Sequence, residues 1–83
     1  MWGGIFLKIY FSKEATKFLK KQDKPTQQRL LDAISKIPNG DIKKLQGRNG
    51  YRLRVGTYRI IFNEDGIIIN IISIGNRGQI YKH

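Results

Sequence analysis

The hydrophobic period of this chain changes once, near its middle. Between residues 13 and 37 apolar residues recur every three or four positions, as in amphipathic helices, and from residue 51 they alternate with polar residues, as in strands. This change predicts an α+β fold. The 83 residues are enough for one hydrophobic core and too few for two, so residues 1–83 are expected to form a single domain.

Two helices are predicted in the first half. Ser12 offers an N-cap hydroxyl, and the helix from residue 13 carries apolar residues on one side and lysines on the other. Pro25 suits the first turn of a second helix, which runs until residues 38–40 (Pro-Asn-Gly) stop it. The two helices should form a hairpin.

Four strands are predicted from β-branched and aromatic content and from turn signals. They are Ile5–Phe11, Tyr51–Val55, Tyr58–Phe62 and Ile67–Ile74. The last of these is apolar at almost every position, which is typical of a strand buried on both faces with neighbours on both edges, so the first strand should lie beside it. Residues 41–50 are interpreted as a polar connection, residues 75–78 as a loop or bulge, and residues 79–83 as a short closing segment.

The predicted order is β-α-α-β-β-β, with the helical hairpin packed on one face of a mostly antiparallel four-stranded sheet. Tyr51, Leu53 and Val55 should face the helices, and Tyr58 and Phe62 should join the core.

Charge restricts the partners of this chain. Sixteen Lys and Arg residues against six Asp and Glu residues give a net charge of +10, so polyanions are the expected partners. Nucleic acid, an acidic protein and an anionic membrane all satisfy this condition, but the chain has no long one-sided amphipathic helix with apolar anchors, which argues against a membrane. Without cysteine, or a signal peptide in the apolar residues 1–7, a cytoplasmic location is expected.

Several kinds of catalysis lack the residues they need. The six acidic residues are expected on helix surfaces and in turns, and His83 is the only histidine. Metal-dependent and Ser-His-Asp chemistry are therefore not expected, and no metal or cofactor is predicted.

Arginine is the residue type that could still form a functional site in this chain. Alternation places Arg52 and Arg54 on the sheet face opposite the core, Arg59 lies on the next strand, and Arg77 follows the last one. A guanidinium group binds phosphate oxygens through a bidentate fork and keeps its charge. Tyr81 adds a ring on which a base could stack. Any one of these arginines alone would be interpreted as an ordinary surface residue, but the group favours a binding site for a nucleic-acid backbone.

These residues also carry a family resemblance. Residues 51–62 (Tyr-Arg-Leu-Arg-Val-Gly-Thr-Tyr-Arg-Ile-Ile-Phe), 72–77 (Ile-Ser-Ile-Gly-Asn-Arg) and 80–81 (Ile-Tyr), with the lead-in 44–47 (Lys-Leu-Gln-Gly), resemble the RelE family of toxins from toxin-antitoxin pairs. The likeness extends from about Leu7 to Tyr81 and implies a RelE-like fold. ParE-type gyrase poisons share this scaffold, so the resemblance supports the fold more firmly than the activity.

The resemblance implies roles for individual residues. Arg59 corresponds to the family's transition-state arginine, Arg77 to its general acid or leaving-group stabiliser, and Tyr81 to the tyrosine that stacks on the substrate base. The remaining residues expected to contact RNA are Lys43, Lys44, Arg48, Lys82 and His83.

The sequence departs from the RelE family pattern at two positions, and this leaves the general base undefined. Arg52 and Arg54 occupy positions where the best-known member has lysines, and arginine almost never gives up its proton. Both are still expected in the catalytic site. The base is left open between three side chains and a purely electrostatic activation with no base; the side chains are Tyr81, Lys82 and His83.

The function implied is that of a ribosome-dependent mRNA endoribonuclease. Its expected partners are the ribosome, mRNA and a cognate acidic antitoxin, with which it could form a higher-order complex. Two alternatives stay open: a ParE-like toxin that inhibits DNA gyrase without cleaving nucleic acid, and an inactive basic relative that only binds RNA.

Overall fold

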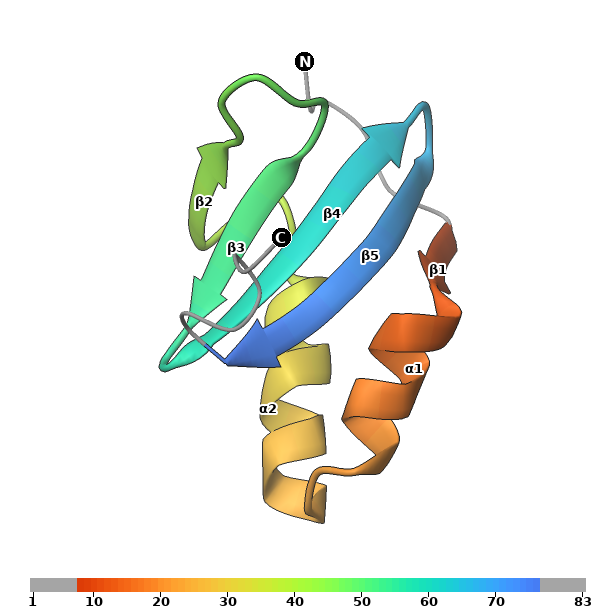
Figure 1. The fold of residues 1–83 in the computed structure, drawn as a ribbon, viewed down its shortest axis with the longest axis vertical. Coiled ribbons are helices and arrows are strands. Elements are labelled where there is room, and N and C mark those ends of the chain that lie inside the picture. The colour runs from red at the N-terminus through yellow and green to blue at the C-terminus, as the bar shows by residue number, and fades with distance from the viewer. Residues whose placement is uncertain (1–7, 77–83) are drawn as a thin grey trace.

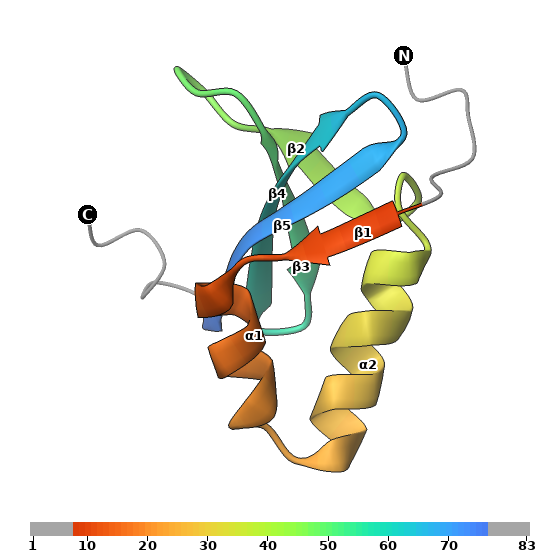
Figure 2. The same cartoon turned by 90° about the vertical axis from the view of Figure 1, so that its right-hand side faces the viewer.

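The computed structural model describes residues 8–76, which form two helices and one five-stranded sheet (Figure 1). The elements are β1 (Lys8–Phe11), α1 (Lys13–Lys20), α2 (Lys24–Ser35), β2 (Asp41–Lys44), β3 (Tyr51–Val55), β4 (Tyr58–Asp65) and β5 (Ile68–Asn76). The two helices run side by side, joined by a short turn, in both views (Figures 1 and 2). The α+β class and the helical hairpin are thus confirmed.

The strand order is β1-β5-β4-β3-β2. β1 pairs with β5 in parallel, and the other three pairs are antiparallel. The predicted position of the first strand beside the long apolar strand is confirmed. Over residues 68–71, β5 therefore has a neighbour on each edge, which satisfies its backbone hydrogen bonds on both sides there.

Local signals fix where the helices begin. The Ser12 hydroxyl accepts a hydrogen bond from the Ala15 amide at 3.0 Å and donates one to the carbonyl of Ile72 at 2.6 Å, so one side chain both caps α1 and ties it to β5. Asp23 caps α2, and hydrogen bonds from the side chain and the backbone amide of Thr26 lower the pKa of its carboxyl group.

The core lies between the helices and one face of the sheet. Phe62 is fully buried, and its ring stacks on Tyr51 with 5.5 Å between centroids, while Tyr58 meets Phe18 of α1 edge-to-face at 6.0 Å. The predicted core role of the three sheet aromatics is confirmed. The other buried core residues are Ala15, Leu30, Ile34, Ile37, Leu53, Ile60, Ile69, Ile71 and Ile74.

Three predictions about strands need correction. The segment predicted as a polar connection contains β2, a four-residue edge strand that covers little of the core and so shows no apolar alternation. Ile67 was expected in the last strand but lies in the tight turn after Gly66, where it is 52% exposed. Gly75 and Asn76, expected in a loop, continue β5 as partners of β4.

Burial of the last strand on both faces is also only partly right. Ile69, Ile71 and Ile74 are buried, whereas Asn70 and Ser73 between them are partly exposed, because the described helices cover only one face of the sheet. We call the other face the helix-free face. Residues 5–7 of the predicted first strand and residues 77–83 lie outside the described residues.

Gly50 provides a test of this packing. Its φ is +132°, and a Cβ atom would lie 3.0 Å from the backbone carbonyl oxygen of Phe62, which cannot move without breaking the sheet. Gly66 has a φ of +66° with open space around it. We expect Gly66→Ala to lower the unfolding free energy by about 1 kcal/mol and Gly50→Ala by about 2–3 kcal/mol. Urea denaturation measures both, and equal losses would show that the contact with Phe62 is unimportant.

Candidate functional site

The cations predicted for the site meet in two cross-strand pairs. Arg54 on β3 lies opposite Arg59 on β4, and Arg52 on β3 lies opposite Lys43 on β2. All four are on the helix-free face, because they alternate with the core residues of their strands. We call Lys43, Arg52, Arg54 and Arg59 the cationic patch.

This arrangement has an energetic cost. Like charges directly opposite each other on neighbouring strands destabilise a sheet, and the patch contains two such pairs. Asp41 lies beside the patch, with its Oδ2 3.9 Å from Arg54 Nε across a partly exposed surface. A pair of that length and exposure contributes little. A bound anion would relieve the repulsion between the paired cations.

Arg52 also has unused hydrogen-bond capacity. Its Nε and Nη2 atoms are buried, and no acceptor within the described part of the chain takes a hydrogen bond from them. Buried donors without acceptors are costly and rare in folded proteins. Two N–H groups on the same edge of one guanidinium match the two oxygens of a phosphate. The donor geometry therefore suits an oxyanion.

A hollow of about 410 Å³ adjoins the patch. It is lined by Lys43, Lys44, Leu45, Gln46, Arg48 and Arg52. Three residues predicted to contact RNA thus share one hollow with a residue predicted to be catalytic. Together they extend the positive surface from β3 across β2 into the loop that follows it.

The remaining predicted site residues, Arg77, Tyr81, Lys82 and His83, lie outside the described residues. The sequence did not predict one neighbour of the cationic patch, Asp41. Asp41 was placed in a polar connection, but it belongs to β2 and lies opposite Arg54. Glu64 and Asp65, expected in a turn, end β4. Nothing in the sequence marked β2 as a strand, so its pairing with β3 was hidden.

A metal site and a membrane-spanning helix are both absent from the described residues. Within residues 8–76, no three His, Cys, Asp or Glu side chains lie close enough to hold a metal ion. No described helix is long and apolar enough to cross a membrane.

The patch can bind and stabilise a phosphate group. Its charges lie on rigid strands, and electrostatic stabilisation requires donors that are already in place when charge develops. Its four cationic side chains can neutralise negative charge and orient a bound group.

The chain is similar to a known protein family. Residues 9–81 match the model of the ParE toxin of type II toxin-antitoxin systems. Comparison with curated protein sequences gives no match.

Solved structures are similar over almost the whole chain. A chain of the RelB-RelE antitoxin-toxin complex from Methanococcus jannaschii is 31% identical, with a TM-score of 0.70, covering 87% of this chain and 94% of that one. A chain of the archaeal RelE-RelB complex from Pyrococcus horikoshii OT3 is 26% identical, with a TM-score of 0.72 and coverages of 90% and 99%. A chain of the RelBE2 complex from Mycobacterium tuberculosis, at 19% identity and a TM-score of 0.74 with coverages of 90% and 95%, shares the fold.

Proposed function

The chain belongs to the RelE/ParE superfamily of toxins from type II toxin-antitoxin systems, and we propose that it is an endoribonuclease that cleaves mRNA on the ribosome. The observation that carries this proposal is the pair of like-charged contacts, Arg54 with Arg59 and Arg52 with Lys43, on one sheet face. The two side chains of each pair repel each other, and an RNA backbone is a polyanion that would offset this repulsion.

In the proposed reaction, the 2′-hydroxyl of one nucleotide attacks the adjacent 3′-phosphate. The P–O bond to the 5′-oxygen breaks, giving a 2′,3′-cyclic phosphate and a free 5′-hydroxyl. Arg52 and Arg54 orient the backbone and polarise the nucleophile, and Arg59 neutralises the phosphorane. From the sequence, Arg77 assists departure of the 5′-oxygen, and Tyr81 stacks on a base. The general base that accepts the proton of the 2′-hydroxyl stays open. It is Tyr81, Lys82 or His83, or there is none and the activation is purely electrostatic.

The ribosome supplies what this surface lacks. A patch on the face of a sheet holds phosphates but does not force the in-line geometry that the attack needs, and alignment can account for several kcal/mol of a barrier. The decoding site of the ribosome, which already fixes the conformation of the mRNA, would provide this in-line geometry. Isolated RNA should then be a poor substrate.

The match to the ParE family model favours one second candidate, a toxin that inhibits a topoisomerase without cleaving anything. Primer extension on a translated mRNA separates the two. With the protein added, new 5′ ends should appear within codons of the translated message and not on the same RNA without ribosomes. No new ends, together with inhibition of gyrase supercoiling, would favour the second candidate.

Lysine substitutions test how the patch binds phosphate. We expect Arg52→Lys to lower the cleavage rate about tenfold, because it removes a charge-assisted hydrogen bond of a bidentate fork. Arg54→Lys should cost only a few-fold, since one buried N–H group of Arg54 lacks a hydrogen-bond partner within the described residues, compared with two of Arg52. Rates from primer extension under single-turnover conditions measure both. Equal effects would contradict the special role of Arg52, and a large gain from lysine at either position would mean that the chain lacks a proton acceptor.

The proposed cognate antitoxin should be acidic where it covers the patch. Opposite charges speed diffusional encounter, so the association rate should fall steeply between low and physiological salt. Apolar anchors on the antitoxin should leave the dissociation rate much less affected. Surface plasmon resonance with the protein encoded beside this one would measure both rates. An association rate that is independent of salt, or an antitoxin without an acidic excess, would contradict this account.

A further inference from the structure

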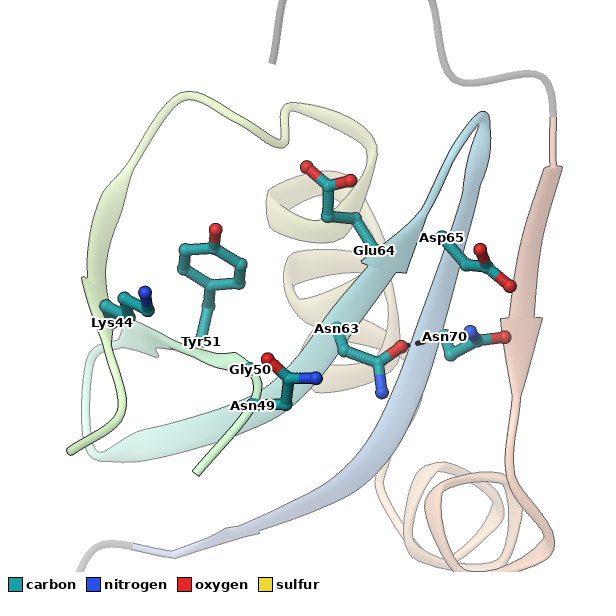
Figure 3. Close-up of a pocket in the computed structure, with 8 residues that line it drawn as sticks. All are labelled: Lys44, Asn49, Gly50, Tyr51, Asn63, Glu64, Asp65 and Asn70. Carbon is teal, nitrogen blue, oxygen red and sulfur yellow. Dashed lines mark hydrogen bonds between the residues drawn. The ribbon is translucent and has the colours of Figure 1, made fainter. Parts of the chain in front are cut away.

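A second hollow, of about 540 Å³, lies beside the end of β4 and differs chemically from the cationic patch. Its lining is Lys44, Asn49, Gly50, Tyr51, Asn63, Glu64, Asp65 and Asn70. Three side-chain amides gather there, those of Asn49, Asn63 and Asn70 (Figure 3). We call this space the amide hollow.

The sheet creates the amide hollow by a mismatch in strand length. Tyr51, the first residue of β3, lies opposite Phe62, so the last three residues of β4 have β5 as a partner but none on β3. A Cβ atom at Gly50 would lie 3.0 Å from the Phe62 carbonyl oxygen, and the chain before Gly50 leaves the sheet. The space beside residues 63–65 is therefore bordered by one strand and one loop.

The amide pair at its base retains hydrogen-bond capacity. Asn70 Nδ2 donates to Asn63 Oδ1 at 3.0 Å, and Figure 3 shows the two side chains turned toward each other. This is the one hydrogen bond recorded for either amide within residues 8–76, and it leaves the Nδ2 group of Asn63 as a donor and the Oδ1 of Asn70 as an acceptor. A nucleobase edge also presents donors and acceptors side by side.

The charge of the amide hollow argues against a second phosphate site. Glu64 and Asp65 line it, and Lys44 is the one cation among its described lining residues. A phosphate would gain little there, whereas a neutral base would not be repelled. An exposed ring is also close by, since Tyr10, 52% exposed, lies opposite Asn70 on the helix-free face and could stack on a base.

The two surfaces are adjacent. Asn63 lies two residues along β4 from Ile61, the cross-strand neighbour of Arg52, which corresponds to roughly 7 Å on the same face. Lys44 lines both the amide hollow and the cationic hollow. An RNA strand held by the patch would pass close enough to place a neighbouring base over the amide pair.

We propose that the amide hollow binds one nucleobase of the RNA whose phosphates the cationic patch holds, and so gives cleavage a sequence preference. The inference rests on the proposed function. Side-chain amides pair most often with adenine, through a bidentate contact, so adenine is the expected base at one fixed position relative to the cut.

Mapping of cut sites on translated mRNA tests this with Asn63→Ala and Asn70→Ala. Each change removes half of the pair without changing charge, and Gln28→Ala, an amide on the exposed surface of α2, is the matched control. The protein and the control should prefer adenine about tenfold over the other bases at the fixed position. Both test variants should reduce that preference to twofold or less, whereas total cleavage by the Gln28→Ala control should stay within about threefold of the unmodified protein. Unchanged cut-site distributions in both folded variants would overturn the inference.

A binding measurement keeps the inference separate from the proposed function. Side-chain amide NMR signals of Asn63 and Asn70 should shift when a short adenine-containing RNA is added to the protein, and less with an RNA that has uridine in its place. If the protein never cleaves RNA but these shifts occur, the endoribonuclease proposal fails and the base site stands. If neither amide responds to either RNA, the base site is wrong even where cleavage occurs.

Discussion

Arg59→Ala should reduce mRNA cleavage on the ribosome by a factor on the order of 10² to 10³, as the loss of one preorganised charge donor does in other enzymes. Arg59 lies on β4, the central strand of the sheet, opposite Arg54 and beside Gly75 of β5. Its strand neighbour Ile60 faces the core, so the backbone position of residue 59 should survive the change. The growth inhibition caused by the protein should disappear with the cleavage.

The control for this experiment is Lys20→Ala, which removes the same charge from the exposed end of α1, on the layer opposite the patch. Its cleavage rate should stay within a few-fold of the unmodified protein. Circular dichroism and urea denaturation establish that both variants are folded. Full toxicity of a folded Arg59→Ala protein would remove Arg59 from the site, and with it the like-charged pair on which the proposed function depends. The same experiment with Arg77→Ala tests the role assigned to that residue from the sequence.

Phe62→Ala should cause the largest loss of stability, about 3–5 kcal/mol, because it removes a fully buried ring from the centre of the core. The ring stacks on Tyr51 and lies opposite Ile71 on β5, so its loss affects three strands. A domain of this size has a total stability of the order of 5–10 kcal/mol. The variant should therefore be partly unfolded at 37 °C.

Ile67→Ala is the matched control, since it also shortens an apolar side chain but at an exposed turn. Its unfolding free energy should change by no more than about 0.5 kcal/mol. Chemical denaturation followed by circular dichroism compares the two. A Phe62→Ala protein as stable as Ile67→Ala would mean that the helices do not pack on the sheet as described.

The like-charged pairs of the cationic patch lower the stability of the sheet, and this cost bears on function. A stable sheet would be easier to build with opposite charges at the Arg54–Arg59 and Arg52–Lys43 positions. Proteins commonly give up some stability where a site requires it. Acidic substitutions such as Lys43→Glu would therefore be expected to favour folding while weakening the binding of a polyanion.

Local patterns in the sequence predicted the layers of this protein. Periods of 3.6 and 2 mark which residues face a common core, and caps and turns mark where elements begin, so α1, α2, β3 and most of β4 and β5 followed from local chemistry. Alternation along β3 also placed Arg52 and Arg54 on the face away from the helices. These features depend on neighbours within a few residues of each other, which a sequence displays directly.

Which residues lie opposite each other on neighbouring strands depends on tertiary packing. β2 has little apolar content of its own and is a strand because β3 pairs with it, so its register with Arg52 and Arg54 could not be predicted. The bulge between Ile61 and Phe62 sets the pairing of Asn63 with Asn70, and the unequal lengths of β3 and β4 open the amide hollow. The position of a bulge and the pairing of a polar edge strand depend on packing between whole segments, which neighbouring residues in the sequence do not display.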